Sequence, residues 1–246
     1  MANAVRTMTS TRKTALVAGI FYLLTFVSIP TLGLYNTLKT DQNFVTLAGS
    51  STSVLWGCVL EIVVALAGIG TAVTLYPVVR RQNESMALGF VATRTLEAAM
   101  IFLGVVSLLS LVTLRNDFSA ASDHTGLIAT GESLVGIYKG TFVVGQTLMP
   151  AMNAFLLGTL LYQSRLVPRI LPVLGLIGAP LLTVSTLAIV LGHNEIGSPW
   201  SALSTLPIAV WEFGLGLWLT FKGFRPSPIT EAMDAEARRS AAGLPV

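Results

Sequence analysis

Two charged residues lie well inside a stretch of sequence that is otherwise apolar. Arg94 and Glu97 fall within residues 87–114, a run longer than the roughly 20 residues that a helix needs to cross the hydrocarbon core of a bilayer. An arginine at that depth costs on the order of 3 kcal/mol on insertion scales, so it is expected to face protein or water and to have a partner. Since residues three apart are neighbours on a helix, Glu97 is predicted to neutralise part of the Arg94 charge.

A later apolar run carries polar residues at intervals of seven. Lys139, Gln146 and Asn153 therefore fall near one face of a helix, together with Pro150. A proline at this position leaves the carbonyl of Gln146 without its usual helical donor, which membrane helices tolerate where neighbouring groups satisfy the backbone. The spacing predicts a polar stripe that faces the bundle interior. A packing kink with hydrogen bonds between helices explains the same pattern equally well.

Two further glutamates lie inside apolar runs. Glu61 shares its helical face with small residues, which let a neighbouring helix approach, so it is predicted to point inward. Depth along the helices predicts that Glu61 pairs with Lys139, and that Arg94 pairs with Glu97, Glu212 or both. Three glutamates against two cations leave one carboxylate unmatched. Glu212 has no basic residue in its own run, so we expect it to take up a proton, either for function or simply as the cheapest way to bury it.

The elements that must position these residues are six apolar runs. The chain of 246 residues is 53% hydrophobic and only 11% charged, against about 25% charged for typical soluble domains, which indicates a membrane protein. We predict an all-α fold, an integral membrane bundle of six transmembrane helices. The predicted spans are residues 14–34, 54–78, 87–114, 133–162, 170–191 and 201–221.

The basic residues indicate the orientation. Of those that lie outside the spans, 11 fall on the side of the N-terminus and only two, Lys39 and Arg115, fall on the other side, so the N-terminus is predicted inside. An even number of spans then puts both termini in the cytoplasm. The predicted domains are a cytoplasmic segment 1–13, a six-helix transmembrane domain 14–221 and a cytoplasmic polar tail 222–246. No internal repeat supports an inverted-repeat transporter.

Several kinds of chemistry have no basis in the sequence. His124 and His193 lie in separate loops without ligand-spaced partners, so we predict no metal site and no cofactor. Ser133 could serve as a nucleophile, but no predicted span carries a histidine to activate it, and we assign no catalytic residue. The basic residues lie at span ends, where topology explains them, so nucleic acid is not predicted as a partner.

Three stretches carry a resemblance to a known family. They are LYPVVRRQNESMALGFVATRTLEAAMI (residues 75–101), RLVPRILPVLGLIGAPLL (165–182) and WEFGLGLWLTFKGF (211–224). They resemble a bacterial family of six-span membrane proteins catalogued as domain of unknown function 4386, over about residues 12–224. The resemblance implies six helices, a location in the bacterial plasma membrane and no assigned activity. Arg94, Glu97 and Glu212 are among the residues that carry it.

The leading functional interpretation is a protein that binds a small solute or a proton, or lets it permeate, as a transporter does. Arg94 would hold an anionic group or a carboxylate, and Glu212 would exchange a proton. The alternative is a structural or regulatory subunit that pairs with another membrane protein. A membrane-embedded hydrolase is less favoured, because no nucleophile and base pair is visible. The predicted central polar cavity is formed by Glu61, Arg94, Glu97, Lys139, Gln146, Asn153 and Glu212.

Overall fold

The computed structural model describes residues 8–35, 38, 50–118 and 124–243, and within these ranges the regular structure is entirely helical. This confirms the predicted all-α class. Predictions about residues 1–7 and Lys39 lie outside the described residues. The elements are α1 (Ser10–Leu24), the 3₁₀ helix η1 (Thr25–Ser28), α2 (Thr31–Leu34), α4 (Ser51–Val79), α5 (Glu84–Phe118), α6 (His124–Phe142), the π-helix η2 (Val143–Leu148), α7 (Met149–Ser164), α8 (Ile170–Val190), α9 (Pro199–Phe221) and α10 (Pro228–Ala241).

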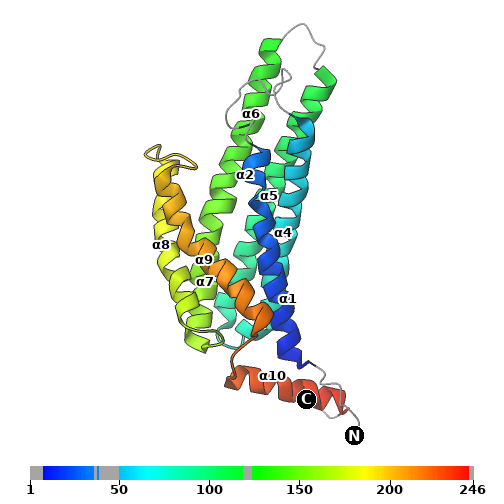
Figure 1. The fold of residues 1–246 in the computed structure, drawn as a ribbon, viewed down its shortest axis with the longest axis vertical. Coiled ribbons are helices and arrows are strands. Elements are labelled where there is room, and N and C mark those ends of the chain that lie inside the picture. Colours follow the sequence, from blue (N-terminus) through cyan, green and yellow to red (C-terminus); the bar gives the residue numbers. More distant parts are fainter. Residues whose placement is uncertain (1–7, 36–37, 39–49, 119–123, 244–246) are drawn as a thin grey trace.

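Five helical stretches in the described part of the chain are long and apolar enough to cross a membrane. They coincide with the second to sixth predicted spans. The predicted connection 115–132 is wrong in part, because α5 and α6 run on into it and extend beyond the ends of α8 and α9 (Figure 1). The stretches are Ser51–Val79, Glu84–Asn116, Thr125–Ser164, Ile170–Val190 and Pro199–Phe221.

The first predicted span, residues 14–34, is not one continuous helix. α1 ends at Leu24, and the chain continues through η1 and α2. Pro30 explains the break, because it has no N–H to donate and its ring clashes with the carbonyl four residues earlier. Hydroxyl groups then satisfy backbone carbonyls inside this segment, as a membrane environment requires. The hydroxyls that donate to the carbonyl three residues earlier are those of Thr25, Ser28 and Thr31, at 2.7, 3.0 and 2.5 Å.

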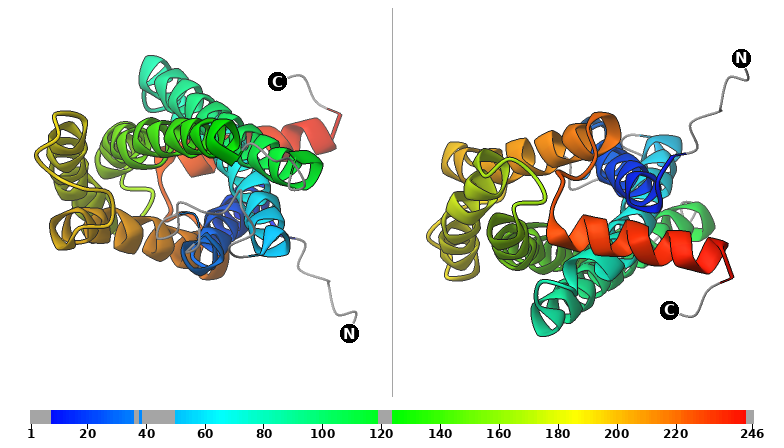
Figure 2. Two further views of the ribbon diagram at one scale, coloured as in Figure 1. Left: turned by 90° about the horizontal axis from the view of Figure 1, so that it is seen from above. Right: turned by 90° about the horizontal axis from the view of Figure 1, so that it is seen from below.

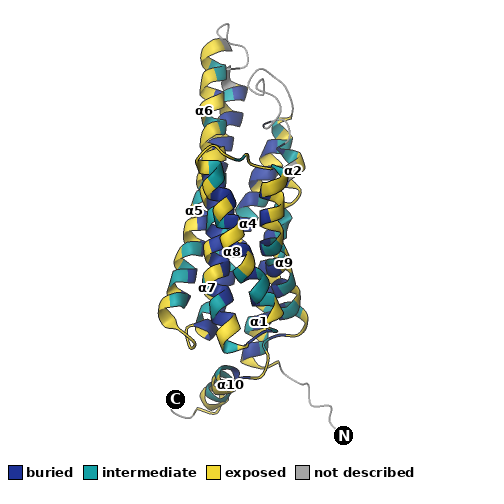
Figure 3. Ribbon diagram, turned by 90° about the vertical axis from the view of Figure 1, so that its left-hand side faces the viewer, coloured by how far each residue is buried: buried dark blue, intermediate teal, exposed yellow. Residues whose placement is uncertain are grey.

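The long helices form a closed ring. α1 packs on α4, α4 on α5, and α5 on the α6–η2–α7 stretch; α7 then packs on α8, α8 on α9, and α9 returns to α1. Figure 2 shows this ring from both ends of the bundle. Exposed residues lie on its outer faces and buried residues on the faces turned inward (Figure 3). Residues on non-adjacent helices of the ring can therefore meet only across its interior.

Glycines let α9 approach both of its neighbours closely. A Cβ atom at Gly19 of α1 would overlap the backbone of Thr220 and the carbonyl of Gly216 on α9. On the other side, two glycines of α8 also permit a close approach to α9. There Gly175 lies against the ring of Trp211, and Gly178 lies against Ile208.

The polar tail contains α10 (Pro228–Ala241), which lies across one end of the ring (Figures 1 and 2). Ser227 caps this helix through a capping box with Thr230. Asp234 accepts hydrogen bonds from the backbone N–H and the hydroxyl of Thr11, at 3.2 and 3.0 Å, at the start of α1. α1 therefore begins at the same end of the bundle at which α10 lies.

Candidate functional site

Arg94 on α5 is the centre of a buried charge cluster. Its Nη1 donates to Oε2 of Glu97 at 3.0 Å, one turn further along α5. Its Nη2 donates to Oε1 of Glu212 on α9 at 2.5 Å. Both predicted partners of Arg94 are thus present. Because α5 and α9 are not neighbours in the ring, the second ion pair crosses the interior of the bundle.

Asn153 of α7 fixes the position of the Glu97 carboxylate. Its Nδ2 donates to Glu97 Oε2 at 2.6 Å, while its Oδ1 accepts from the Thr93 hydroxyl at 2.5 Å. The same Glu97 oxygen therefore receives one bond from a guanidinium and one from an amide. Hydrogen bonds to a buried ionised group are stronger than those between neutral groups, so Asn153 holds α7 to α5 at this level. We define the charge cluster as Arg94, Glu97, Glu212 and Asn153.

Burial makes these ion pairs unlike ordinary surface pairs. The side chains of Arg94, Glu97 and Glu212 are 3, 10 and 15% exposed. The guanidinium carbon also lies 5.4 Å from the ring centre of Tyr22 on α1 and 5.9 Å from that of Phe90. Aromatic faces attract cations at such distances, most strongly when water is excluded. The pocket around Arg94 is thus built by α1, α5 and α9 together.

A cavity of about 350 Å³ adjoins the charge cluster. Arg94, Glu97 and Glu212 lie on its wall with Gln146 of η2. Two carboxylates share one guanidinium there, so the ionised cavity carries a net charge of −1. The charged wall can hold a proton or a cation. The apolar remainder of the lining consists mainly of Phe26, Ile29, Val64, Ile101, Pro150, Leu182 and Ile208.

Glu61 is buried at 2% exposure and points into the bundle, as predicted. Its Oε1 accepts from the Tyr138 hydroxyl at 2.9 Å and from Gln146 Nε2 at 3.4 Å. The predicted pairing with Lys139 is wrong, because Lys139 is an exposed residue on the outside of the bundle. Of the predicted polar stripe, Gln146 and Asn153 face inward and Lys139 does not.

The π-helix η2 explains why Lys139 leaves the stripe. The N–H of Met149 bonds to the carbonyl of Val144, five residues earlier, and a π turn of this kind takes up one residue more than the α turn it replaces. Residues before η2 are therefore rotated by one position relative to those after it. Tyr138 occupies the place that a continuous helix would give to Lys139. Pro150 follows directly as the second residue of α7 and was the only hint of this irregularity in the sequence.

Several residues of the site were not among the predicted ones. Phe90 stands one turn before Arg94 on the same helix, so helical spacing alone could have identified it. Helical spacing gave no such signal for the other three. Thr93 and Tyr22 meet partners on other helices, and Tyr138 faces Glu61 only because of the rotation at η2. Among the described residues, no three His, Cys, Asp or Glu side chains gather closely enough to hold a metal ion.

These features define the class: a helical membrane protein with an ionised cluster inside a ring of helices. The chain belongs to the family described as Domain of unknown function (DUF4386), whose model matches residues 17–223. That range includes every residue of the charge cluster. No similar protein was found among curated proteins or among solved structures. The family membership predicted from the three stretches is confirmed, and it brings no assigned activity.

Proposed function

We propose that this multi-pass membrane protein binds a small solute or a proton in the central cavity, and that the bound species passes through the bundle. One observation carries the proposal: the cavity of about 350 Å³ reaches Arg94, Glu97 and Glu212 directly. Ion pairs that served only to join helices would need no such space beside them. Ligand sites are typically cavities of roughly 300–1,000 Å³, mostly apolar with a few polar groups, and this cavity fits that description.

In this proposal Arg94 holds the two carboxylates in place instead of binding an anion itself. Each of its terminal nitrogens already donates to one glutamate. Glu212 is the more exposed of the two carboxylates, and it is the group that exchanges a proton. Gln146 lines the same cavity and also donates to Glu61, so it connects Glu61 with the cavity wall. Lys139 has no role in the site.

We also propose six spans, with both termini on the cytoplasmic side of the plasma membrane. The segment from Ser10 to Leu34 has 25 residues, which at about 1.5 Å per residue give roughly 37 Å. A hydrocarbon core is about 30 Å thick, so this broken segment is long enough to serve as the first of the six spans. The excess of basic residues on the side of α10 supports the orientation.

Thiol accessibility tests whether the cavity admits solutes. Ile208 and Leu215 are both buried residues of α9, but only Ile208 lines the cavity. In a Cys58→Ala background, Ile208→Cys should react with 2-aminoethyl methanethiosulfonate at least tenfold faster than Leu215→Cys. The matched control on the same helix excludes general unfolding. Equal, slow reaction of both variants would overturn the proposal and favour a sealed structural subunit.

A further inference from the structure

We propose that the ligand of the central cavity is an organic monocation, an ammonium group on a small apolar body, which enters sideways from the bilayer between η1 and α9. This inference rests on the proposed function and names the class of ligand for the same site. Charge, the nature of the wall and the position of the mouth each support it.

The charge of the cavity selects a cation. Glu97 Oε1 and Glu212 Oε2 have no hydrogen-bond partner among the described residues, whereas both terminal nitrogens of Arg94 are occupied. Arg94 Nε is buried without a hydrogen-bond partner. An anion that approached Arg94 would also meet the two carboxylates bound to it, which repel negative charge. A monocation would instead bring the net charge of the cavity to zero.

The wall selects an apolar body. A small hydrated ion gains nothing from an apolar lining, whereas burial of apolar surface stabilises a ligand by about 25 cal/mol per Å². Phe26 adds an aromatic ring to this lining, and aromatic faces attract ammonium groups. The chemistry of the cavity therefore matches a ligand with a charged head and a hydrocarbon or aromatic remainder.

The mouth of the cavity faces the side of the bundle. Ile29 and Thr205 line the cavity and are also exposed on the outside, Ile29 at 58%. Towards the α10 end, Gly19 and Gly216 hold α1 tightly against α9. At the 3₁₀ break this close packing ends, and the rings of Phe26 and Phe213 meet edge to face, 5.1 Å between centres.

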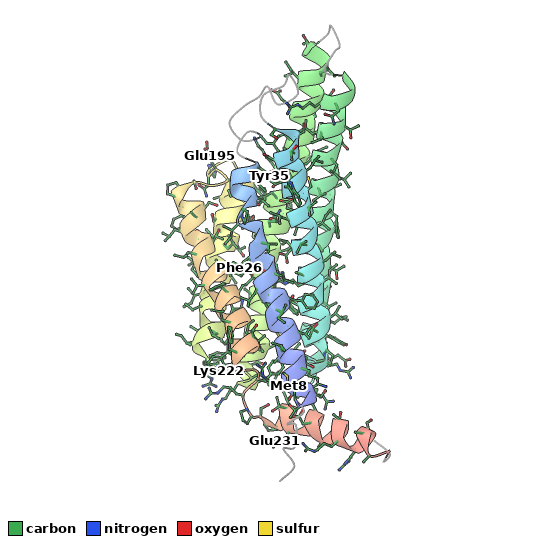
Figure 4. The ribbon with its side chains drawn as sticks, turned by 45° about the vertical axis from the view of Figure 1, so that its right-hand side comes forward. Met8, Phe26, Tyr35, Glu195, Lys222 and Glu231 are labelled. Carbon is green, nitrogen blue, oxygen red and sulfur yellow. The ribbon has the colours of Figure 1, made fainter. Side chains whose placement is uncertain are left out.

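This mouth lies in the part of α9 nearer the turn that joins α8 to α9, because Thr205 is the seventh of the 23 residues from Pro199 to Phe221, roughly 9 Å from the start of the helix at about 1.5 Å per residue. Phe26, which also lines the cavity, lies between Met8 and Tyr35 along the first segment (Figure 4). At that depth the outside of the ring faces lipid under the proposed topology, so the ligand reaches the mouth from the bilayer. A ligand that first enters lipid must itself be partly apolar, which agrees with the nature of the wall.

Binding to the purified protein in a neutral detergent tests the ligand class. We use benzyltrimethylammonium as the cation, with benzyl alcohol and phenylacetate as neutral and anionic compounds of similar shape. Isothermal titration calorimetry should detect the cation with at least tenfold tighter binding than either comparator. Glu212→Gln should weaken cation binding at least tenfold, while Glu195→Gln, in the exposed turn between α8 and α9 (Figure 4), should leave it unchanged.

The outcomes separate the two proposals. Tighter binding of phenylacetate or benzyl alcohol would contradict the proposal that the ligand is a cation, but it would still agree with a solute-binding function. If no probe binds while Ile208→Cys still reacts, the proposed class of ligand is contradicted and the proposed function is not. An unreactive Ile208→Cys overturns the function itself. Since selectivity is measured first on the unchanged protein, the test does not depend on whether Glu212→Gln folds.

The route of entry has its own test. Thr205→Trp should narrow the mouth, whereas Leu203→Trp, at an exposed position of α9 that does not line the cavity, is the matched control. The association rate of benzyltrimethylammonium with immobilised protein should fall at least tenfold for Thr205→Trp and stay unchanged for Leu203→Trp. Equal rates for both variants and the unchanged protein would contradict entry between η1 and α9.

Discussion

The protein contains the same chemical pair, arginine with glutamate, in two very different places. Inside the ring, Arg94 joins Glu97 and Glu212 with side chains no more than 15% exposed. At the end of the bundle, Arg81 donates one hydrogen bond from each terminal nitrogen to the carboxylate of Glu236 on α10, at 3.0 and 2.6 Å. The side chains of this pair are 29 and 44% exposed. The bond lengths are similar, so geometry alone does not distinguish the two sites.

What distinguishes them is the consequence of removing one partner. Loss of Arg81 leaves a carboxylate that water can solvate, and exposed pairs contribute little to stability. Loss of Arg94 leaves two buried carboxylates close together without the guanidinium that both of them contact. We therefore expect the attachment of α10 to depend little on its ion pair, and the packing of the ring to depend strongly on the charge cluster.

The largest effect is expected from Arg94→Met. This change should lower the free energy of unfolding by roughly 3–5 kcal/mol, because it leaves buried charges uncompensated. The measurement is equilibrium unfolding in mixed micelles, with Arg81→Met as the matched control. The control should unfold close to the unchanged protein. Similar losses for the two variants would show that burial does not distinguish the sites.

A combined variant tests whether charge or packing causes that loss. Arg94→Met with Glu97→Gln and Glu212→Gln removes all three charges and keeps similar volumes. It should recover most of the lost stability, since a buried ionic group replaced as a whole is often neutral. The same unfolding measurement applies, and benzyltrimethylammonium should no longer bind. No recovery would indicate that the shape of the arginine matters more than its charge.

A smaller loss is expected from Asn153→Ala. The change removes the amide donor to Glu97 and the acceptor of the Thr93 hydroxyl. We expect the free energy of unfolding to fall by about 1–3 kcal/mol, the usual effect of leaving a buried polar group without a hydrogen-bond partner. Gln163→Ala, at an exposed position on the same helix, is the control. If both variants unfold alike, Asn153 does not hold α7 to α5.

The smallest expected effect is a change with pH in the stability of the contact between Arg81 and Glu236 of α10. The hydrogen bonds from Arg81 lower the pKa of Glu236, so the pair stabilises the docked tail at neutral pH. This contribution is fully present above the ordinary pKa of a glutamate, and it is lost in acid as the pH falls through the lowered pKa of Glu236. Hydrogen exchange in α10 should therefore differ between the unchanged protein and Glu236→Gln at pH 7 and become equal in acid. A difference that persists in acid would show that Glu236 acts other than through its charge.

Much of the site was predictable, because helical spacing is a local property of the chain. Arg94 and Glu97 are three residues apart on one helix, so their contact follows from the sequence. The small residues beside Glu61 indicated that it points inward, and it does. Lys139 shows where such reasoning fails, since a single π turn between two predicted neighbours shifts one of them to another face.

The sequence by itself determined that helices cross a membrane and that charged side chains must meet inside them, because hydrocarbon solvates neither charges nor unpaired backbone groups. Only the tertiary structure decided which groups meet. The ring brings Glu212 across to Arg94 and places Tyr22 beneath the guanidinium, and the broken first segment opens a cavity beside them. These contacts join residues far apart in sequence, so they depend on how whole helices pack and not on the spacing within any one of them.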